Sequence, residues 1–434
     1  MVETSKMNDT TLIAFFELLK DSIYKDNKIT KQYDDVDWNR LFKLAVTNNL
    51  LSIMYTSAMK YGIHEMPEEL KKSMKMLSLQ NMLLESHKYQ AIRKIVDKVE
   101  EENFSLIFFK GIILAELYPY HLLRTSDDTD VFLDKADKEK AIKILEELGY
   151  IRNEEHSKDT VPVYVNQDLG HVVELHFSLW EDYKGPQMNL LDRMELTNVE
   201  KLVKRNVFGI DILSMGYEDH LIYQMFHIIK HFATQSVGVR YLSDITLYIN
   251  KYYEYIDIPS FWNKIKTLGY EKFCYTFFQL CVELLGMDSR ILQEAKNVTG
   301  ADKIQLLYDM ISPIGETRDN MASWQIYSLI TPYLQGDATV SDSKFIRKVK
   351  ILFPGTNALP DRCSYARKYP ILLPVAWMHR IIGWLYRYIR HYISRKYLTE
   401  GDMYGVGGKL SAAEYRLSLM KEMGLVTNKN NKNL

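Results

Sequence analysis

The sequence predicts an α+β protein in which a segment of short strands and helices lies between two helical regions. Before Glu102 and after Gly216, apolar residues recur at three- and four-residue spacing, which is typical of amphipathic helices. Between these positions, compact or alternating apolar runs end at glycine and polar turn residues, and such runs indicate strands. The chain has 434 residues, 47% of them hydrophobic, so it can bury a sizeable core.

We expect four parts along the chain. An N-terminal helical region, an α/β core, a C-terminal helical region and a disordered tail are predicted at 1–103, 104–215, 216–425 and 426–434. The expected elements of the core are, in chain order, a strand in "FSLIFFKG", a short helix in "ILAELY", a strand in "TDVFLD", a helix in "KADKEKAIKILEELG", a strand in "YIRN" and paired strands in "VPVYVN" and "HVVELHFSL".

Composition limits the partners and the compartment. The 55 basic and 56 acidic residues nearly cancel, so the overall charge gives no strong signal for nucleic acid or an anionic membrane. The spacing of Cys274, Cys281 and Cys363 fits neither a disulfide framework nor a zinc knuckle, and indicates core thiols in a reducing compartment. Because the N-terminus lacks the basic segment and cleavage site of a secretory signal, we expect a cytoplasmic protein.

Two aspartates stand at the start of the strand predicted in "DDTDVFL". Alternate side chains of a strand point to the same face, so Asp128 and Asp130 converge while Asp127 and Thr129 point the other way. Two bare carboxylates repel each other, and a divalent cation such as Mg²⁺ removes that repulsion. An isolated pair of this kind is more often an acidic turn that solvates a strand end, so the neighbouring motifs must decide.

Two neighbouring motifs favour a functional site. Upstream, "LIFFKGIILAELY" reads as strand, glycine turn and helix, in which Gly111 would let the backbone approach a phosphate at a helix N-terminus. Downstream, Glu174 lies in the alternating apolar strand "HVVELHF", where an unpaired inward carboxylate would be costly. Glu174 therefore needs a cation or a basic partner.

The combination resembles the nucleotidyltransferase superfamily of the polymerase-β type, and more narrowly the family called uncharacterised nucleotidyltransferase. The segments "FFKGIILAELYPYHLLRTSDDTDVFLD", "HVVELHFSLW", "HLIYQMFHIIKHF" and "VRYLSDITLYI" carry the likeness, which is strong from about Lys98 to Asn250. The resemblance implies a small mixed β-sheet core with helical flanks. It also implies transfer of a nucleoside monophosphate from a nucleoside triphosphate, with Mg²⁺ or Mn²⁺, to a small-molecule, sugar or protein acceptor, and release of pyrophosphate.

The resemblance also assigns roles to residues. Asp128, Asp130 and Glu174 would be catalytic and hold the metals, while Lys110, Gly111 and Arg124 would contact the triphosphate. For Arg124, a salt bridge to Asp127 is an equally good alternative. The superfamily usually has a small hydroxyl residue after the glycine, and Ile112 in that place removes one phosphate contact.

Further polar residues on the later helices could complete the site. His227 and His231 share one helical face, as do Arg240 and Asp244 on the next helix. The resemblance makes them nucleotide or acceptor contacts, or a lock between the two helices, and His176 shares the strand face of Glu174. Zinc at the histidine pair is the weaker alternative, because a third ligand at catalytic spacing is missing.

A basic aromatic segment, Trp377–Lys396, has three interpretations. A packed helix with snorkelling arginines is favoured over a helix in a membrane interface, and nucleic-acid binding has no accompanying motif. A weak peripheral membrane contact therefore stays a minor hypothesis.

Two classes of function remain. The first is the metal-dependent nucleotidyltransferase, and the second is a non-catalytic nucleotide-binding or scaffold protein on the same fold. The presence of all three carboxylates favours the enzyme, whereas Ile112 keeps the second class in view.

Overall fold

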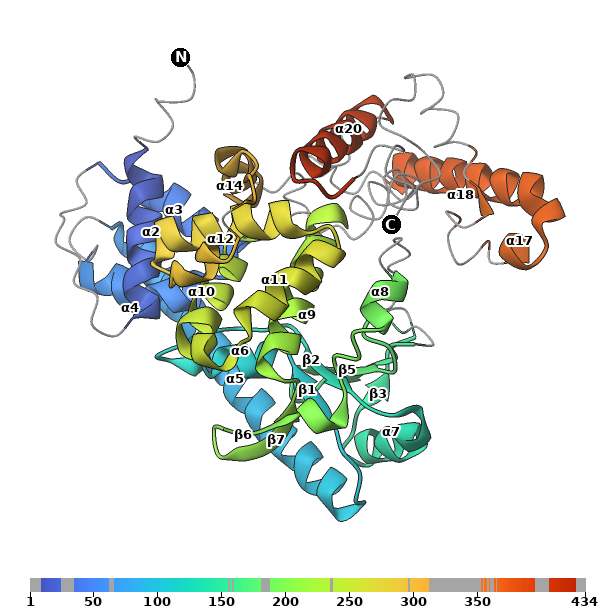
Figure 1. Ribbon diagram of the computed structural model, residues 1–434, viewed down its shortest axis with the longest axis horizontal. Coiled ribbons are helices and arrows are strands. Elements are labelled where there is room, and N and C mark those ends of the chain that lie inside the picture. Colours follow the sequence, from blue (N-terminus) through green and yellow to red (C-terminus); the bar gives the residue numbers. More distant parts are fainter. Residues whose placement is uncertain are drawn as a thin grey trace.

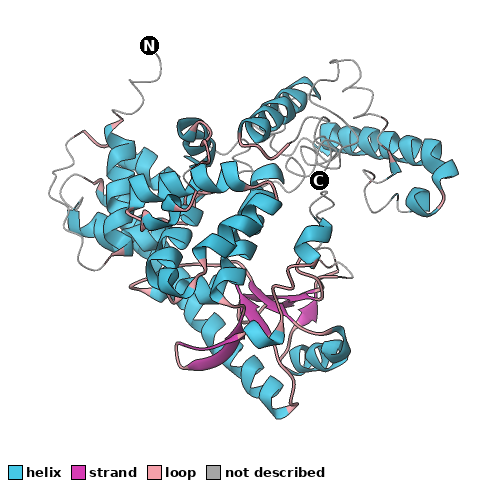
Figure 2. Ribbon diagram, in the orientation of Figure 1, coloured by secondary structure: helices cyan, strands magenta, loops and turns pink. Residues whose placement is uncertain are grey.

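The structure is a computed structural model of the chain (Figure 1). It describes residues 9–24, 35–61, 66–311, 353–394 and 406–426, apart from short gaps at 155–156, 158–159, 181–187, 235–236, 296, 354, 357–358, 360–362 and 364. Figure 2 shows the strands gathered into one part of the molecule, with helices around them.

Short strands form one seven-stranded mixed sheet in the order β3-β4-β5-β2-β1-β7-β6. Their bounds are β1 Ile107–Phe109, β2 Thr129–Phe132, β3 Ile151–Arg152, β4 Val163–Asn166, β5 His171–His176, β6 Val203–Val207 and β7 Ile210–Ser214. Central strand β2 runs antiparallel to β1 and parallel to β5, and β1 runs parallel to β7. The predicted α+β class with a mixed sheet is confirmed.

The β6–β7 hairpin was not predicted from the sequence. Its turn consists of Phe208 and Gly209, with φ of 54° and 77°. Two central residues with positive φ are the mark of a tight hairpin turn that matches the twist of its strands. The alternation in "VKRNVFGIDIL", interrupted by a glycine, was the available signal.

Helices precede, interrupt and follow the sheet. Those before it are α2 Thr10–Ile23, α3 Trp38–Thr47, α4 Leu51–Tyr61 and α5 Glu68–Glu101. Those within the strand-bearing segment are α6 Gly111–Ala115, α7 Lys138–Glu147 and α8 Met188–Asp192. Those after it are α9 Tyr217–Thr234, α10 Arg240–Tyr252, α11 Ile258–Thr267, α12 Glu271–Leu285, α13 Arg290–Gln293, α14 Lys303–Ile311, α17 Tyr365–Lys368, α18 Leu373–Ser394 and α20 Val406–Glu422.

Two hydrophobic clusters cover the two faces of the sheet. On one face, Val131 and Leu175 pack with Ile92 of α5 and Ile144 of α7. On the other face, Phe109 belongs to a larger cluster that contains α2, α4, α9, α10 and α12. Helices from before and after the sheet therefore share one core. The four-part division of the chain itself remains a prediction.

The C-terminal predictions are only partly accessible. Helix α18 covers most of the segment Trp377–Lys396, and the predicted tail lies outside the described residues from 427 onward. Within the described part of the chain, none of the helices combines the length and the apolar character that crossing a membrane requires.

Candidate functional site

The register of β2 against β5 brings two acids together. Asp130 lies directly opposite Glu174 in this parallel pair, and the hydroxyl of Thr129 points to the other face, where its Oγ1 lies 2.9 Å from His171 Nε2. Asp130 is 2% exposed, whereas the Glu174 side chain is 27% exposed. The register of β2 against β5 therefore places one buried and one accessible carboxylate on the same face.

His176, on the same face of β5, links the two acids. Its Nε2 lies 3.0 Å from Asp130 Oδ1 and 3.4 Å from Glu174 Oε2. Burial would lower the pKa of His176, but the hydrogen bonds to the two carboxylates raise it above its ordinary value. His176 therefore acts as a donor that fixes the Asp130 carboxylate.

Lys110 places a positive charge at Asp130. Its Nζ lies 2.7 Å from Asp130 Oδ1, and its backbone N–H donates to His220 Nε2 at 3.2 Å. Burial would raise the pKa of Asp130, but the Lys110 ammonium and the His176 hydrogen bond outweigh it and hold that pKa below its usual range. Asp130 is therefore ionised, and both of these contacts are made by its Oδ1 atom.

Asp128 has a different environment from Asp130. It is half-buried just before β2, and burial together with the charge on Asp130 raises the pKa of Asp128 to about 7. Burial is the larger cause of this raised pKa, and repulsion by Asp130 adds to it despite the nearby Lys110 charge. A cation with oxygen ligands would relieve that repulsion.

The donor set fits a divalent metal ion. Asp130, Glu174 and His176 form the one group in the described part of the chain whose three ligand atoms all lie within 4.8 Å of one another. Asp128 is outside that group but close enough for its charge to interact with Asp130 and Glu174. Carboxylate oxygens are the ligands that Mg²⁺ and Mn²⁺ prefer.

The guanidinium of Arg124 is occupied by a carboxylate on α10. Arg124 Nη2 lies 2.9 Å from Asp244 Oδ2, and its Nε donates to Asp244 Oδ1 at 3.1 Å. The Tyr118 hydroxyl donates to the same Oδ1 at 2.8 Å. Arg124 thus pairs with Asp244 rather than with Asp127, and two nitrogens of its buried guanidinium already donate to that carboxylate.

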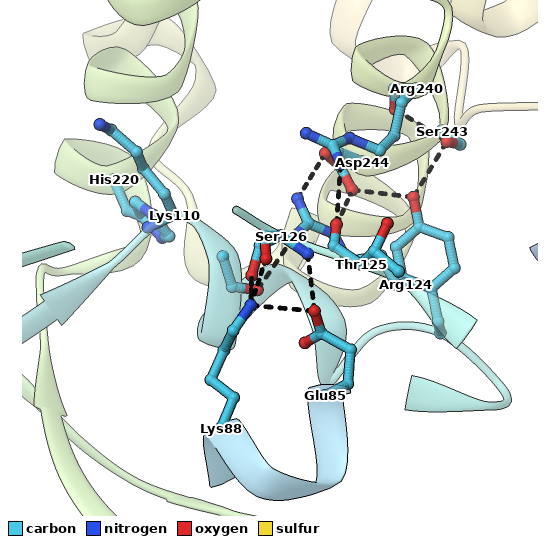
Figure 3. A network of polar contacts seen from close by, with 12 residues as sticks. Glu85, Lys88, Lys110, Arg124, Thr125, Ser126, His220, Arg240, Ser243 and Asp244 are labelled. Carbon is cyan, nitrogen blue, oxygen red and sulfur yellow. Dashed lines mark hydrogen bonds and ion pairs between the residues drawn. The ribbon is translucent and has the colours of Figure 1, made fainter. Parts of the chain in front are cut away.

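The loop that leads into β2 is held from two sides (Figure 3). From α5, Glu85 Oε1 accepts the Ser126 N–H at 2.9 Å, and Lys88 Nζ donates to the Ser126 carbonyl and, at 3.0 Å, to its hydroxyl. From α10, Arg240 Nη1 donates to the Thr125 carbonyl at 2.7 Å. Both flanking helical regions thus set the position of the loop that ends at Asp128.

Gly111 faces this same loop. A Cβ at that position would lie 3.1 Å from Ser126 Oγ and 3.3 Å from Ser126 Cβ. The glycine therefore permits a close approach of α6 to the loop, in addition to any approach of a phosphate. Ile112, the residue that departs from the superfamily pattern, is buried in the core cluster beneath the sheet.

The predicted histidine pair does form on α9. His231 Nε2 and His227 Nε2 lie 2.9 Å apart, so one ring donates and the other accepts. Burial, and then the nearby Lys110 charge, hold the pKa of His227 well below its ordinary value. The pair lies near Lys110, beside the ring of Tyr241.

Three supporting residues were missed by sequence reasoning. His220 precedes His227 and His231 by seven and eleven residues, so its place on their helical face was a usable signal. Glu85 and Lys88 are spaced like an ordinary surface pair on a long helix, and nothing local distinguishes them.

Comparison with known proteins gives the family to which the chain belongs. The model of a family described as uncharacterised nucleotidyltransferase matches residues 34–286, and no curated protein matches the chain. Among solved structures, the chain is similar to an antigenic nucleotidyltransferase-like protein from Paracoccidioides brasiliensis, with 16% identity over 41% of this chain and 92% of that one. Its TM-score of 0.24 is too low to establish a common fold. The family match spans more than half of the chain and every predicted site residue, so the chain belongs to the uncharacterised nucleotidyltransferase family.

Proposed function

We propose that the protein is a metal-dependent nucleotidyltransferase that moves a nucleoside monophosphate from a nucleoside triphosphate to an acceptor and releases pyrophosphate. The observation that carries this proposal is the pairing of Asp130 with Glu174 on one sheet face, beside Asp128. Family membership supports the same class of reaction.

Asp128, Asp130 and Glu174 would hold Mg²⁺ or Mn²⁺. Such an ion, when bound, neutralises triphosphate charge and lowers the pKa of the acceptor hydroxyl. His176 donates to Asp130 and keeps that carboxylate oriented toward the site. Positioning and electrostatics account for most of the catalysis in phosphoryl-type transfers, so few further side chains are needed.

Glu174 is the accessible acid and the candidate proton acceptor. In this scheme, the acceptor oxygen forms a bond to the α-phosphorus while the bond from that phosphorus to the bridging oxygen breaks, and pyrophosphate leaves. The acceptor's proton passes to the Glu174 carboxylate. Its 27% side-chain exposure, against 1% for Asp130, supports giving this role to Glu174.

Nucleotide recognition is assigned to the surface beside Lys110. Lys110 would bind phosphate oxygens at the Gly111 turn, and His227 and His231 would contact nucleotide or acceptor from α9. The lowered pKa of His227, caused by burial and then by Lys110, supports a neutral ring that donates or accepts hydrogen bonds. The loop that ends at Asp128 would be held in place by the ion pair of Arg124 with Asp244 and by Arg240, without direct contact of these residues with the nucleotide.

The alternative is a nucleotide-binding or scaffold protein without catalysis. One observation favours it: the Lys110 ammonium lies at Asp130, in a place where an active site would need its metal. A weak peripheral membrane contact through α18 stays a minor hypothesis, and the apolar side chains of Val375, Met378 and Ile382 on that helix are exposed.

Label transfer separates the two proposals. The protein is incubated with each of the four nucleoside triphosphates, labelled at the α-phosphate or the γ-phosphate, in a cell extract containing Mn²⁺. An active enzyme transfers the α-label, not the γ-label, to one class of acceptor, and Asp128→Asn/Asp130→Asn abolishes that transfer. If no triphosphate donates its α-label while metal-dependent nucleotide binding persists, the non-catalytic alternative holds.

A further inference from the structure

The ammonium group of Lys110 is enclosed more tightly than a phosphate-binding lysine would require. It lies 2.7 Å from Asp130 Oδ1, and the rings of Phe109 and Tyr223 have their centroids 5.5 and 5.8 Å from it. The Lys110 side chain is 17% exposed and the Asp130 side chain 1% exposed. The ammonium therefore sits in a box of two aromatic faces and one carboxylate, and cations are attracted to all three.

The backbone of Lys110 is held in an unfavourable conformation to keep it there. Its φ is 56° and its ψ is −118°, a region that glycine enters readily and other residues rarely do. His220 is fully buried and accepts the Lys110 N–H, which anchors this conformation. Strain that persists because its surroundings enforce it is a feature of functional sites.

We propose that Lys110 is the resident counter-cation of Asp130, and that its ammonium gives way to a divalent metal ion only when a triphosphate is present to receive it. Metal and nucleotide then bind cooperatively. This inference rests on the proposed function, because it assigns Asp130 to the metal.

Charge balance explains why the exchange would need the nucleotide. A divalent ion that arrives alone meets a carboxylate that is already neutralised, and two cations at one carboxylate repel each other. A displaced Lys110 ammonium would also lose its carboxylate partner while it is still enclosed by the two aromatic rings, where little water can replace that partner. Triphosphate oxygens supply a new anionic partner for Lys110 and additional ligands for the metal ion. The coupling is a difference in binding free energy, so it acts equally on both ligands.

In the absence of nucleotide, Lys110 also protects the fold. Asp130 would otherwise be a buried carboxylate beside Asp128 and Glu174, with His176 as its remaining donor. The Lys110 ammonium would thus neutralise Asp130 when no ligand is bound, and contact phosphate when the metal ion and the triphosphate are bound.

Calorimetric titration of Mn²⁺ into the full-length protein tests the exchange. Each variant is titrated alone and in the presence of a saturating non-hydrolysable nucleoside triphosphate analogue. Lys110→Met removes the ammonium, and Lys110→Gly removes it while also relieving the backbone strain, so at least one variant should remain folded. Lys110→Arg keeps the charge. Lys135→Met makes the same charge change at an exposed lysine beyond β2.

We expect wild type to bind Mn²⁺ alone weakly, and the analogue to tighten that binding at least tenfold. Lys110→Met and Lys110→Gly should bind Mn²⁺ alone about tenfold more tightly than wild type, with a smaller gain from the analogue. Mn²⁺ should also raise the melting temperature of these two variants more than that of wild type. Lys135→Met should behave like wild type, and Lys110→Arg, which keeps the positive charge, should bind Mn²⁺ alone no more tightly than wild type.

The inference is overturned if Lys110→Met and Lys110→Gly bind Mn²⁺ alone no more tightly than wild type while Asp130→Asn abolishes metal-dependent nucleotide binding. In that case the proposed function stands without the exchange. If no variant binds Mn²⁺ with or without the analogue, the proposed metal site itself is wrong.

Discussion

Arg124 Nη2 lies 2.9 Å from Asp244 Oδ2, and this ion pair joins the loop before β2 to α10 across 120 residues of sequence. Both side chains are almost completely buried, at 4% and 2% exposure. Removing one partner of a buried pair leaves the other charge without compensation, which is far more costly than losing an exposed pair.

Asp244→Asn should therefore lower the free energy of unfolding by about 3–5 kcal/mol. Urea denaturation measures the effect. Glu254→Gln removes one of the two carboxylate partners of Arg290, the more exposed one, so it is the matched control and should cost less than about 1 kcal/mol. Equal costs for the two substitutions would mean that the buried pair does not anchor the loop.

Two buried histidines give stability a defined pH dependence. Burial lowers the pKa of His171 and of His220 to about 3, from an ordinary value of 6.5. At pH values between about 3 and 6.5, these histidines bind protons in the unfolded chain but stay neutral in the folded protein. The free energy of unfolding therefore falls as the pH falls below 6.5. At pH 5 the loss is about 2 kcal/mol for each histidine.

His171→Gln isolates one of these terms. It removes hydrogen bonds to Thr129 and Tyr150, so it should destabilise the protein at pH 7, but by about 2 kcal/mol less at pH 5. Tyr150→Phe removes one of the same hydrogen bonds without removing the imidazole, and its effect should be the same at both pH values. If His171→Gln is equally destabilising at pH 7 and pH 5, His171 is not held neutral.

Gly111 should tolerate no side chain while Ser126 is present. The Cβ of Gly111→Ala would be 3.1 Å from Ser126 Oγ, and such overpacking costs about 1 kcal/mol or more. In a Ser126→Gly background the obstruction is gone, so the same alanine should become neutral or slightly stabilising in a helix. A double-mutant cycle of unfolding free energies measures this coupling. Additive effects would show that the loop moves away freely.

The acids of the site should differ sharply in their effect on transfer. Asp130→Asn should reduce label transfer about 100-fold or more, because it weakens both the metal site and the Lys110 pair. Asp127→Asn removes an exposed carboxylate from the same loop and should leave transfer within about twofold, since screened surface charges contribute little. Comparable losses in both variants would argue that net charge, rather than a defined metal site, governs the reaction.

Local patterns predicted much of the site. The alternation around Asp130 placed it correctly on the face opposite to Thr129, and the strand containing Glu174 and His176 was recognised from its own period. What no local pattern could give was the register of β2 against β5, because register depends on contacts between distant segments.

The partners of the charged residues were the least predictable part. Arg124 has acids within a few residues, yet its partner Asp244 comes from a helix that folds against the loop from far along the chain. The sequence suggested that Lys110 contacts phosphate, and only the fold shows that its ammonium forms an ion pair with Asp130. Glu85 and Lys88 looked like a solvated helix pair, and burial against Ser126 gives them their role.

The position of a bound metal ion tests the central claim most directly. A crystal of the full-length protein with Mn²⁺ and a non-hydrolysable nucleoside triphosphate analogue would show the ion by anomalous scattering. The account predicts a peak about 2.1 Å from carboxylate oxygens of Asp128 and Asp130, with Lys110 Nζ withdrawn from Asp130 onto a phosphate oxygen. A fully bound triphosphate with no peak at these acids, or with its metal ion held elsewhere, would contradict the account.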